Sequence, residues 1–125
     1  MTFSTHNFEK LKIWKNAFEI ADQVYDQVGS WPKHELYNLS QQTTRSASSV
    51  PANIAEGSAK SSDKDFKRFL EIALGSCYEL QTHLMLAQRR QFGNQKALTD
   101  LLDQIDEEQK MLIGFINRLR TKITS

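Results

Sequence analysis

The most informative segment of this chain is Arg45-Ser46-Ala47-Ser48-Ser49-Val50-Pro51-Ala52-Asn53-Ile54-Ala55-Glu56-Gly57. Its apolar residues Ala47, Val50 and Ile54 recur at steps of three and four, which is the spacing of one face of an α-helix. Between Glu35 and Gly57 the only charged side chains are Glu35, Arg45 and Glu56. A solvent-facing helix surface normally carries many more charges, so we expect this helix to be packed on two sides.

Helical spacing continues on both sides of this stretch. Four helices are expected at about 8–29, 33–57, 62–92 and 96–121, separated by glycine, proline and short polar connections. Ser62 is a candidate N-cap for the third helix, with Asp65 three residues later. Nothing in the chain reads as a strand. Short connections favour antiparallel neighbours, so the sequence predicts an all-α, antiparallel up-down-up-down four-helix bundle formed by a single domain, 1–125.

The periodicity also predicts which residues face the core of this bundle. In the first helix the inward stripe is expected to be Phe8, Leu11, Trp14, Phe18, Ala21, Tyr25 and Val28. In the second helix it is expected to be Leu36, Leu39, Thr43, Ala47, Val50 and Ile54. Pro51 lacks a backbone donor and is expected to kink or split the second helix.

The second and third helices both carry small residues on the face opposite the core. Gly75 lies in the middle of the third helix, where glycine costs about 1 kcal/mol relative to alanine. Close packing on both faces would offset that cost, so we expect a homo-oligomer assembled through these outer faces. The candidates for interface or structural polar residues are Arg45, Ser49, Ala52, Asn53, Glu56, Gly75 and Glu79. The alternative is a monomer with a serine-rich exposed face.

Composition restricts the possible partners and compartment. The chain has 125 residues and a formal net charge of +1, so bulk charge draws it neither to nucleic acid nor to an anionic membrane. The single cysteine, Cys77, cannot form an internal disulfide. No secretion signal and no apolar run of membrane-spanning length is visible, and we therefore expect a cytoplasmic protein that does not contact a membrane.

Catalytic chemistry is not expected. The paired Glu-x-x-His motifs of di-iron bundles are absent, and the three histidines, His6, His34 and His83, lie apart in the sequence. Cys77 lies on the inward stripe of the third helix, where a small core residue is more common than a nucleophile. The sequence therefore predicts no catalytic residue, no metal and no cofactor, and the protein is not expected to be an enzyme.

Basic residues form small local clusters instead. The candidates for nucleic-acid binding are Lys60, Lys64, Lys67 and Arg68, around the start of the third helix. Further pairs and triplets occur at Arg89 and Arg90 and near the C-terminus at Arg118, Arg120 and Lys122. In an oligomer such a patch would be repeated, and phosphate binding grows with the number of contacts.

Several motifs carry a resemblance to a known family. They are Glu35-Leu36-Tyr37-Asn38-Leu39, Gln42, Arg45, 49–57, Phe66, 68–70, 72–73, 75–76 and Glu79-Leu80. The chain resembles the bacterial four-helix-bundle proteins encoded in intervening sequences of large-subunit ribosomal RNA genes. This resemblance implies a ring-shaped homopentamer without established enzymatic activity. More distantly similar are the accessory proteins of diversity-generating retroelements, which bind a reverse transcriptase and nucleic acid. The chain departs from the family pattern at Thr44, where a basic residue is common.

Together these observations predict a non-catalytic homo-oligomeric adaptor, pentameric by the resemblance, that binds structured RNA or a nucleic-acid enzyme. The alternative is a purely structural or protein-interaction module that binds no nucleic acid.

Overall fold

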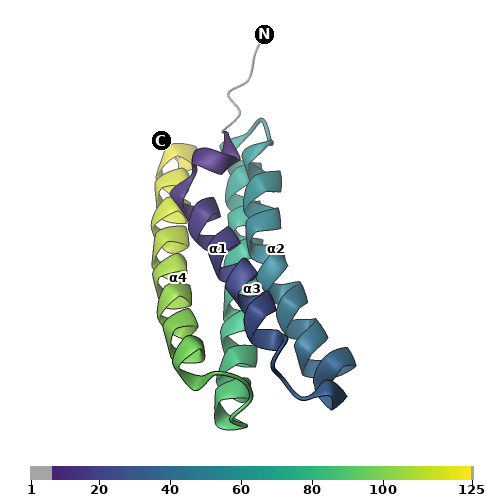
Figure 1. Ribbon diagram of the computed structural model, residues 1–125. Coiled ribbons are helices and arrows are strands. Elements are labelled where there is room, and N and C mark those ends of the chain that lie inside the picture. The colour runs from purple at the N-terminus through teal and green to yellow at the C-terminus, as the bar shows by residue number, and fades with distance from the viewer. Residues whose placement is uncertain (1–6, 125) are drawn as a thin grey trace.

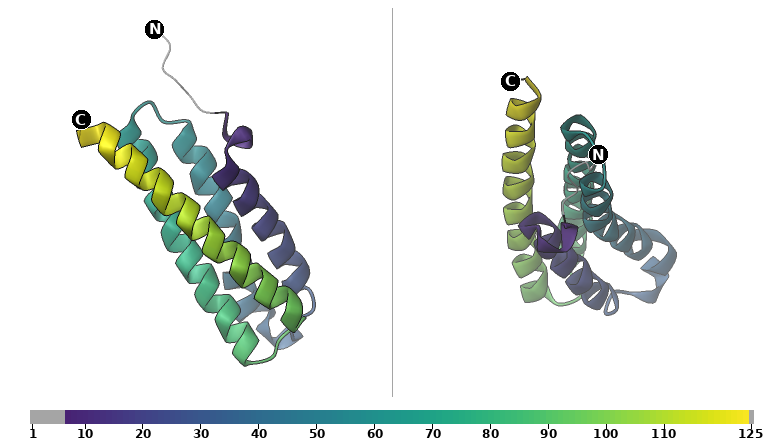
Figure 2. Two further views of the ribbon diagram at one scale, coloured as in Figure 1. Left: turned by 90° about the vertical axis from the view of Figure 1, so that its left-hand side faces the viewer. Right: turned by 90° about the horizontal axis from the view of Figure 1, so that it is seen from above.

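The computed structural model describes residues 7–124, which form four long α-helices and no strand. The helices are α1 (Lys12–Val28), α2 (Gln41–Ser58), α3 (Asp63–Arg89) and α4 (Gln95–Thr124). Each helix packs against two others: α1 and α3 both contact α2 and α4 (Figures 1 and 2). The expected all-α fold with four helices is therefore confirmed.

The bundle core consists of two hydrophobic clusters stacked along the helices. One cluster joins the first half of α1 to the first half of α3, and includes Ile13, Ala17, Phe66 and Leu70. The other joins the second half of α1 to the second half of α3, and includes Ile20, Val24, Leu80 and Leu84. These shared clusters establish which parts of α1 and α3 lie at the same height in the bundle.

The expected inward stripe of the first helix was only partly correct. Ala21 is buried and Leu11, Trp14 and Val28 pack partly buried against the core, but most of the buried side chains belong to a neighbouring stripe. Ile13, Ala17, Ile20 and Val24 are buried, whereas Phe18 and Tyr25 are 53% and 56% exposed. The two stripes are neighbours, about 100° apart around the helix. Ile13, Ala17, Ile20 and Val24 pack in the two core clusters, whereas Phe18 and Tyr25 lie on the side of α1 that faces solvent. Trp14 is partly buried against the first cluster.

The helix expected at 33–57 begins later than predicted and is irregular at its start. A 3₁₀ turn at Lys33–Glu35 leads into a π-helical turn at Leu36–Ser40, where Asn38 has φ −129° and ψ −106°. Leu36 was expected in the core but is exposed. By contrast, α2 continues through Pro51 without interruption, so the expected split is absent.

The other helix ends also have local causes. The first helix begins at Lys12 rather than near residue 8, because a separate 3₁₀ turn at Phe8–Lys10 precedes an extended Leu11. Ser62 caps α3 as predicted: its hydroxyl accepts from the amide of Asp65 at 3.1 Å. Near the end of α2, a Cβ on Gly57 would lie 2.7 Å from that of Phe69, so only glycine permits this approach.

The connection from α3 to α4 is held by one side chain of α1. The Gln27 amide donates to the carbonyl of Asn94 at 3.1 Å, and its oxygen accepts from the Asn94 backbone at 3.0 Å. The same oxygen accepts from the indole of Trp31 at 3.2 Å. Gly93, with φ +68°, lies against both Gln27 and Trp31. A Cβ at this position would overlap the Gln27 side chain, so the turn requires glycine.

Candidate nucleic-acid interface and assembly surfaces

Three basic segments that are distant in the sequence meet at one end of the bundle. The start of α1, the connection between α2 and α3, and the C-terminal end of α4 lie together there (Figure 1). An ion pair of 3.2 Å between Lys122 of α4 and Asp63 of α3 joins two of these segments. We call this surface the basic end. Its cations are Lys10, Lys12, Lys60, Lys64, Lys67, Arg68, Arg118, Arg120 and Lys122.

The four residues predicted to bind nucleic acid all lie at the basic end, but in different environments. Lys67 pairs with Glu71 at 3.2 Å, and Arg68 lies 4.0 Å from Asp65. Lys60 and Arg68 both lie over the ring of Phe69, at 5.1 and 4.6 Å from its centroid. Lys64 is exposed and forms no ion pair with any described residue. Several positive charges are thus already balanced within the chain.

Sequence reasoning did not place Arg118 and Arg120 in this site. It recognised them only as a separate cluster near the C-terminus. Arg118 lies over Phe115, 5.1 Å from the ring centroid, and Arg120 donates to the amide oxygen of Asn117 at 2.7 Å. Both are exposed. Because α3 and α4 run in opposite directions, the C-terminal end of α4 lies at the end of the bundle where α3 begins (Figure 1), and local periodicity alone contains no signal for that arrangement.

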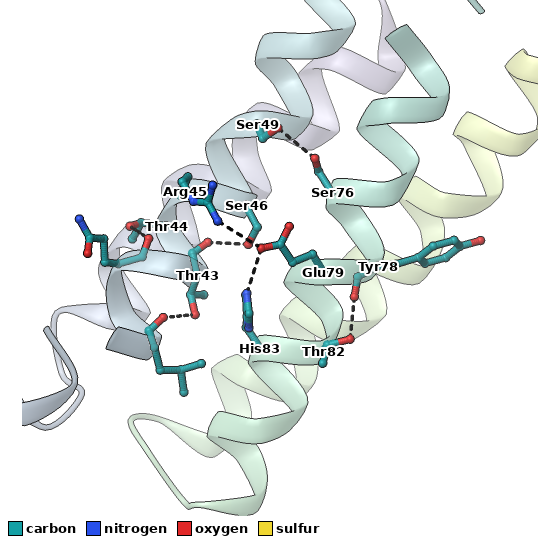
Figure 3. Close-up of polar contacts among 12 residues, drawn as sticks. Thr43, Thr44, Arg45, Ser46, Ser49, Ser76, Tyr78, Glu79, Thr82 and His83 are labelled. Carbon is teal, nitrogen blue, oxygen red and sulfur yellow. Dashed lines mark hydrogen bonds and ion pairs between the residues drawn. The ribbon is translucent and has the colours of Figure 1, made fainter. Parts of the chain in front are cut away.

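The predicted interface residues of α2 and α3 include a polar seam within the chain (Figure 3). The hydroxyls of Ser49 and Ser76 are 2.9 Å apart, and the Asn53 amide donates to the carbonyl of Ser49 at 2.8 Å. Arg45 pairs with Glu79 at 3.7 Å, and Glu79 also contacts Nε2 of His83 at 3.3 Å. Four of the seven candidates, Arg45, Ser49, Asn53 and Glu79, belong to this seam, which joins α2 to α3 of the same chain.

Ala52, Glu56 and Gly75 take no part in this polar seam. Ala52 and Glu56 are exposed on α2. Gly75 is exposed on α3, and a Cβ there would meet no atom within 4 Å. No described residue therefore packs on Gly75, so no contact within the described chain offsets the unfavourable free energy of a glycine in the middle of a helix.

An apolar groove between α1 and α2 is the surface that sequence reasoning missed. We call it the α1–α2 groove. It has a volume of about 370 Å³ and is lined by Trp14, Phe18, Ala21, Asp22, Tyr25, Ser48, Pro51, Ala52 and Ala55. Trp14 and Phe18 stack with their ring centroids 4.9 Å apart. The signal was present in the sequence, because two adjacent apolar stripes on one helix exceed what a single core contact requires.

Two titratable groups lie deep in the core. Burial raises the pKa of the Glu108 carboxyl from 4.5 to about 8, although a hydrogen bond from Asn16, 3.0 Å away, opposes the rise. Burial, and secondarily the charge of Glu108, also raise the pKa of the Cys77 thiol. Cys77 is therefore held as a thiol inside the bundle, where the sequence placed it as a core residue.

The described residues contain no metal-binding cluster of the usual kind. In the range 7–124, no group of three or more His, Cys, Asp or Glu side chains could hold a metal ion. His34 and His83 both line a cleft near the irregular start of the second helical segment, and His6 lies outside the described residues. Over the same range, none of the helices combines the length and apolar character that crossing a membrane requires.

Fold and surface together define an all-α bundle of four helices with one basic end. Similarity to known proteins shows the family to which this bundle belongs. The family model for the 23S rRNA-intervening sequence protein matches residues 9–114. The chain belongs to this family. A solved structure from Bacteroides thetaiotaomicron, described as a protein of unknown function from the S23 ribosomal protein family, is similar with a TM-score of 0.73 and 26% identity. The match covers 83% of this chain and 97% of that one. No curated protein matches the chain.

Proposed function

We propose that this chain is a non-catalytic, homo-oligomeric adaptor that binds structured RNA at its basic end. The observation that carries the proposal is the meeting of three basic segments at that end (Figure 1). The proposed assembly has five copies, a number that rests on the family resemblance. A nucleic-acid enzyme bound through the same RNA, or beside it, belongs to the same proposal.

The physical basis is the electrostatic attraction of lysine and arginine to phosphate. Each phosphate contact releases counterions, so affinity falls steeply as salt rises. Within a single chain the attraction is reduced, because Lys67, Arg68 and Lys122 each face a carboxylate. An oligomer that presents several basic ends to one RNA would gain affinity through multivalency without any new type of contact.

The test is charge reversal at two exposed positions of the basic end, Lys64→Glu combined with Arg120→Glu. We expect weaker binding of a labelled RNA hairpin at low salt and a shallower dependence of affinity on salt. The matched control is Lys96→Glu with Arg90→Glu, which makes the same charge change at the opposite end of the bundle. Equal affinity of both double variants for the hairpin would remove the basic end from the proposal.

A second candidate function, that of a structural or protein-interaction module, is favoured by the contacts that the cations of the basic end already make within the chain. Three cations at the basic end already contact carboxylates, and others lie over Phe69 and Phe115. A structural or protein-interaction module would need these cations only for local stability. Protein purified under low salt with a 260/280 absorbance ratio of clean protein, together with a co-purified protein partner, would favour this second function.

A further inference from the structure

Two exposed apolar surfaces lie on different sides of the bundle, and neither has a partner among the described residues. The first is the α1–α2 groove. The second is a stripe along the outside of α3, which we call the α3 ridge and define by Ile72, Gly75, Glu79, Thr82 and Leu86. The charge of Glu79 is paired with Arg45 of α2 at 3.7 Å. Ile72 and Leu86 are 43% and 47% exposed. Apolar surfaces of this kind commonly mark interaction sites.

The two surfaces lie at the same height in the bundle. Residues flanking Trp14 on α1 share a core cluster with Phe66 to Ala73 of α3, and residues flanking Tyr25 share the other cluster with Leu84 and Ala87. The groove aromatics from Trp14 to Tyr25 span about 16 Å of helix, and Ile72 to Leu86 spans about 21 Å. A second copy rotated about an axis parallel to the helices would therefore bring its ridge level with the groove.

The shapes of the surfaces are also complementary. Trp14, Phe18 and Tyr25 form one wall of the groove, while the residues from α2 are small. Large side chains of a second helix would enter between these walls. Gly75 in the middle of the ridge would let the backbone of that helix come close, and no described residue occupies the space beside it. A close backbone approach would account for glycine at this costly position.

Apart from Glu79, whose charge is paired with Arg45 at 3.7 Å, the charges beside the two surfaces have opposite signs. Asp22 lines the groove and Asp26 is exposed one turn further along α1. Arg89, one turn beyond Leu86, is exposed at the corresponding end of the ridge. Within residues 7–124 none of these three side chains forms an ion pair. If the grooves of two copies faced each other instead, Asp22 and Asp26 of one copy would lie near the same residues of the other, and their like charges would repel.

We propose that the α1–α2 groove receives the α3 ridge of a second copy of this chain. This inference rests on the homo-oligomer in the proposed function and names the surfaces that form it. The contact is head-to-tail, because each copy uses one surface to receive and a different one to insert. Head-to-tail contacts generate a closed ring when the rotation divides a full turn. With the ring axis parallel to the helices, every basic end lies on the same side of the ring.

The test uses two variants that each lose one half of the contact. Phe18→Glu places a charge in the groove and leaves the ridge intact, and Leu86→Glu does the reverse. We expect the wild type to contain at least three chains by light scattering and each variant to be monomeric. An equimolar mixture of the two variants should then form a 1:1 dimer, because one intact ridge and one intact groove remain. Ile113→Glu, at an exposed position of α4, is the matched control and should leave the wild-type mass unchanged.

Each outcome bears on the inference. A monomeric wild type overturns it. A mixture that stays monomeric also overturns it, because an intact groove and an intact ridge would then be shown not to bind each other. A variant that stays dimeric overturns it as well, because its one intact surface would then pair with itself. If Phe18→Glu loses its helical circular dichroism, Ala52→Arg replaces it as the groove variant. A ring that assembles as described but binds no RNA hairpin would leave this inference standing and refute the RNA-binding proposal.

Discussion

At the scale of single residues, Glu108 is the least expected side chain in the core. It is 0% exposed, and one of its carboxyl oxygens has no hydrogen-bond partner in the structure. A buried charge without full compensation is costly, so the neutral acid is favoured, and burial raises the pKa to about 8. The proton on Glu108 is therefore part of the folded state at neutral pH.

This proton makes stability depend on pH. The folded protein binds it more tightly than the unfolded chain, so the contribution of Glu108 is full below pH 4.5 and is lost as the pH rises through about 8. Each unit of difference in pKa corresponds to about 1.4 kcal/mol. Glu108→Gln keeps an acceptor for Asn16 and should remove this part of the pH dependence.

Urea unfolding between pH 4.5 and 9 measures the effect. The free energy of unfolding of the wild type should fall with pH relative to that of Glu108→Gln, and the difference should become constant above about pH 8. The matched control is Glu107→Gln, at an exposed position on the same helix. Parallel curves for the wild type and Glu108→Gln would show that Glu108 is ionised in the folded protein.

At the scale of elements, α3 contains a glycine that its own chain does not need. Gly75 is exposed, and a Cβ would meet no described atom within 4 Å. This differs from Gly57, where α2 and α3 approach too closely for any side chain. We infer that Gly75 serves the assembled state rather than the fold.

Two substitutions of Gly75 separate these roles. In the Phe18→Glu background, which we expect to be monomeric, Gly75→Ala should raise the free energy of unfolding by about 1 kcal/mol through helix propensity. In the wild-type background, Gly75→Leu should reduce the oligomer mass while far-ultraviolet helicity is kept. Urea unfolding and light scattering measure the two effects. An unchanged mass for Gly75→Leu would place Gly75 outside the contact.

At the scale of the whole molecule, assembly and RNA binding should be coupled. A monomer keeps the basic end but loses the repetition of that end around the ring. Phe18→Glu changes no residue of the basic end, so any loss of affinity must come from lost multivalency. We expect it to bind an RNA long enough to span several copies at least about tenfold more weakly than the wild type does.

Fluorescence anisotropy with a long and a short RNA hairpin tests this coupling. The difference between Phe18→Glu and the wild type should be large for the long RNA and small for one that reaches a single basic end. If both hairpins show no difference, each chain binds RNA alone, and assembly serves another purpose.

Four helices, the cap at Ser62, and the burial of Ala47, Val50 and Ile54 could all be predicted from the sequence. These features depend on periodicity and on interactions between near neighbours in the chain. Two adjacent apolar stripes on α1 satisfy the same period, so only packing against α2 and α4 decided that Ala17 and Val24 are buried while Phe18 is exposed. The pairing of Arg45 with Glu79 and of Lys122 with Asp63 likewise depended on the tertiary structure, because both require residues of different helices to lie side by side.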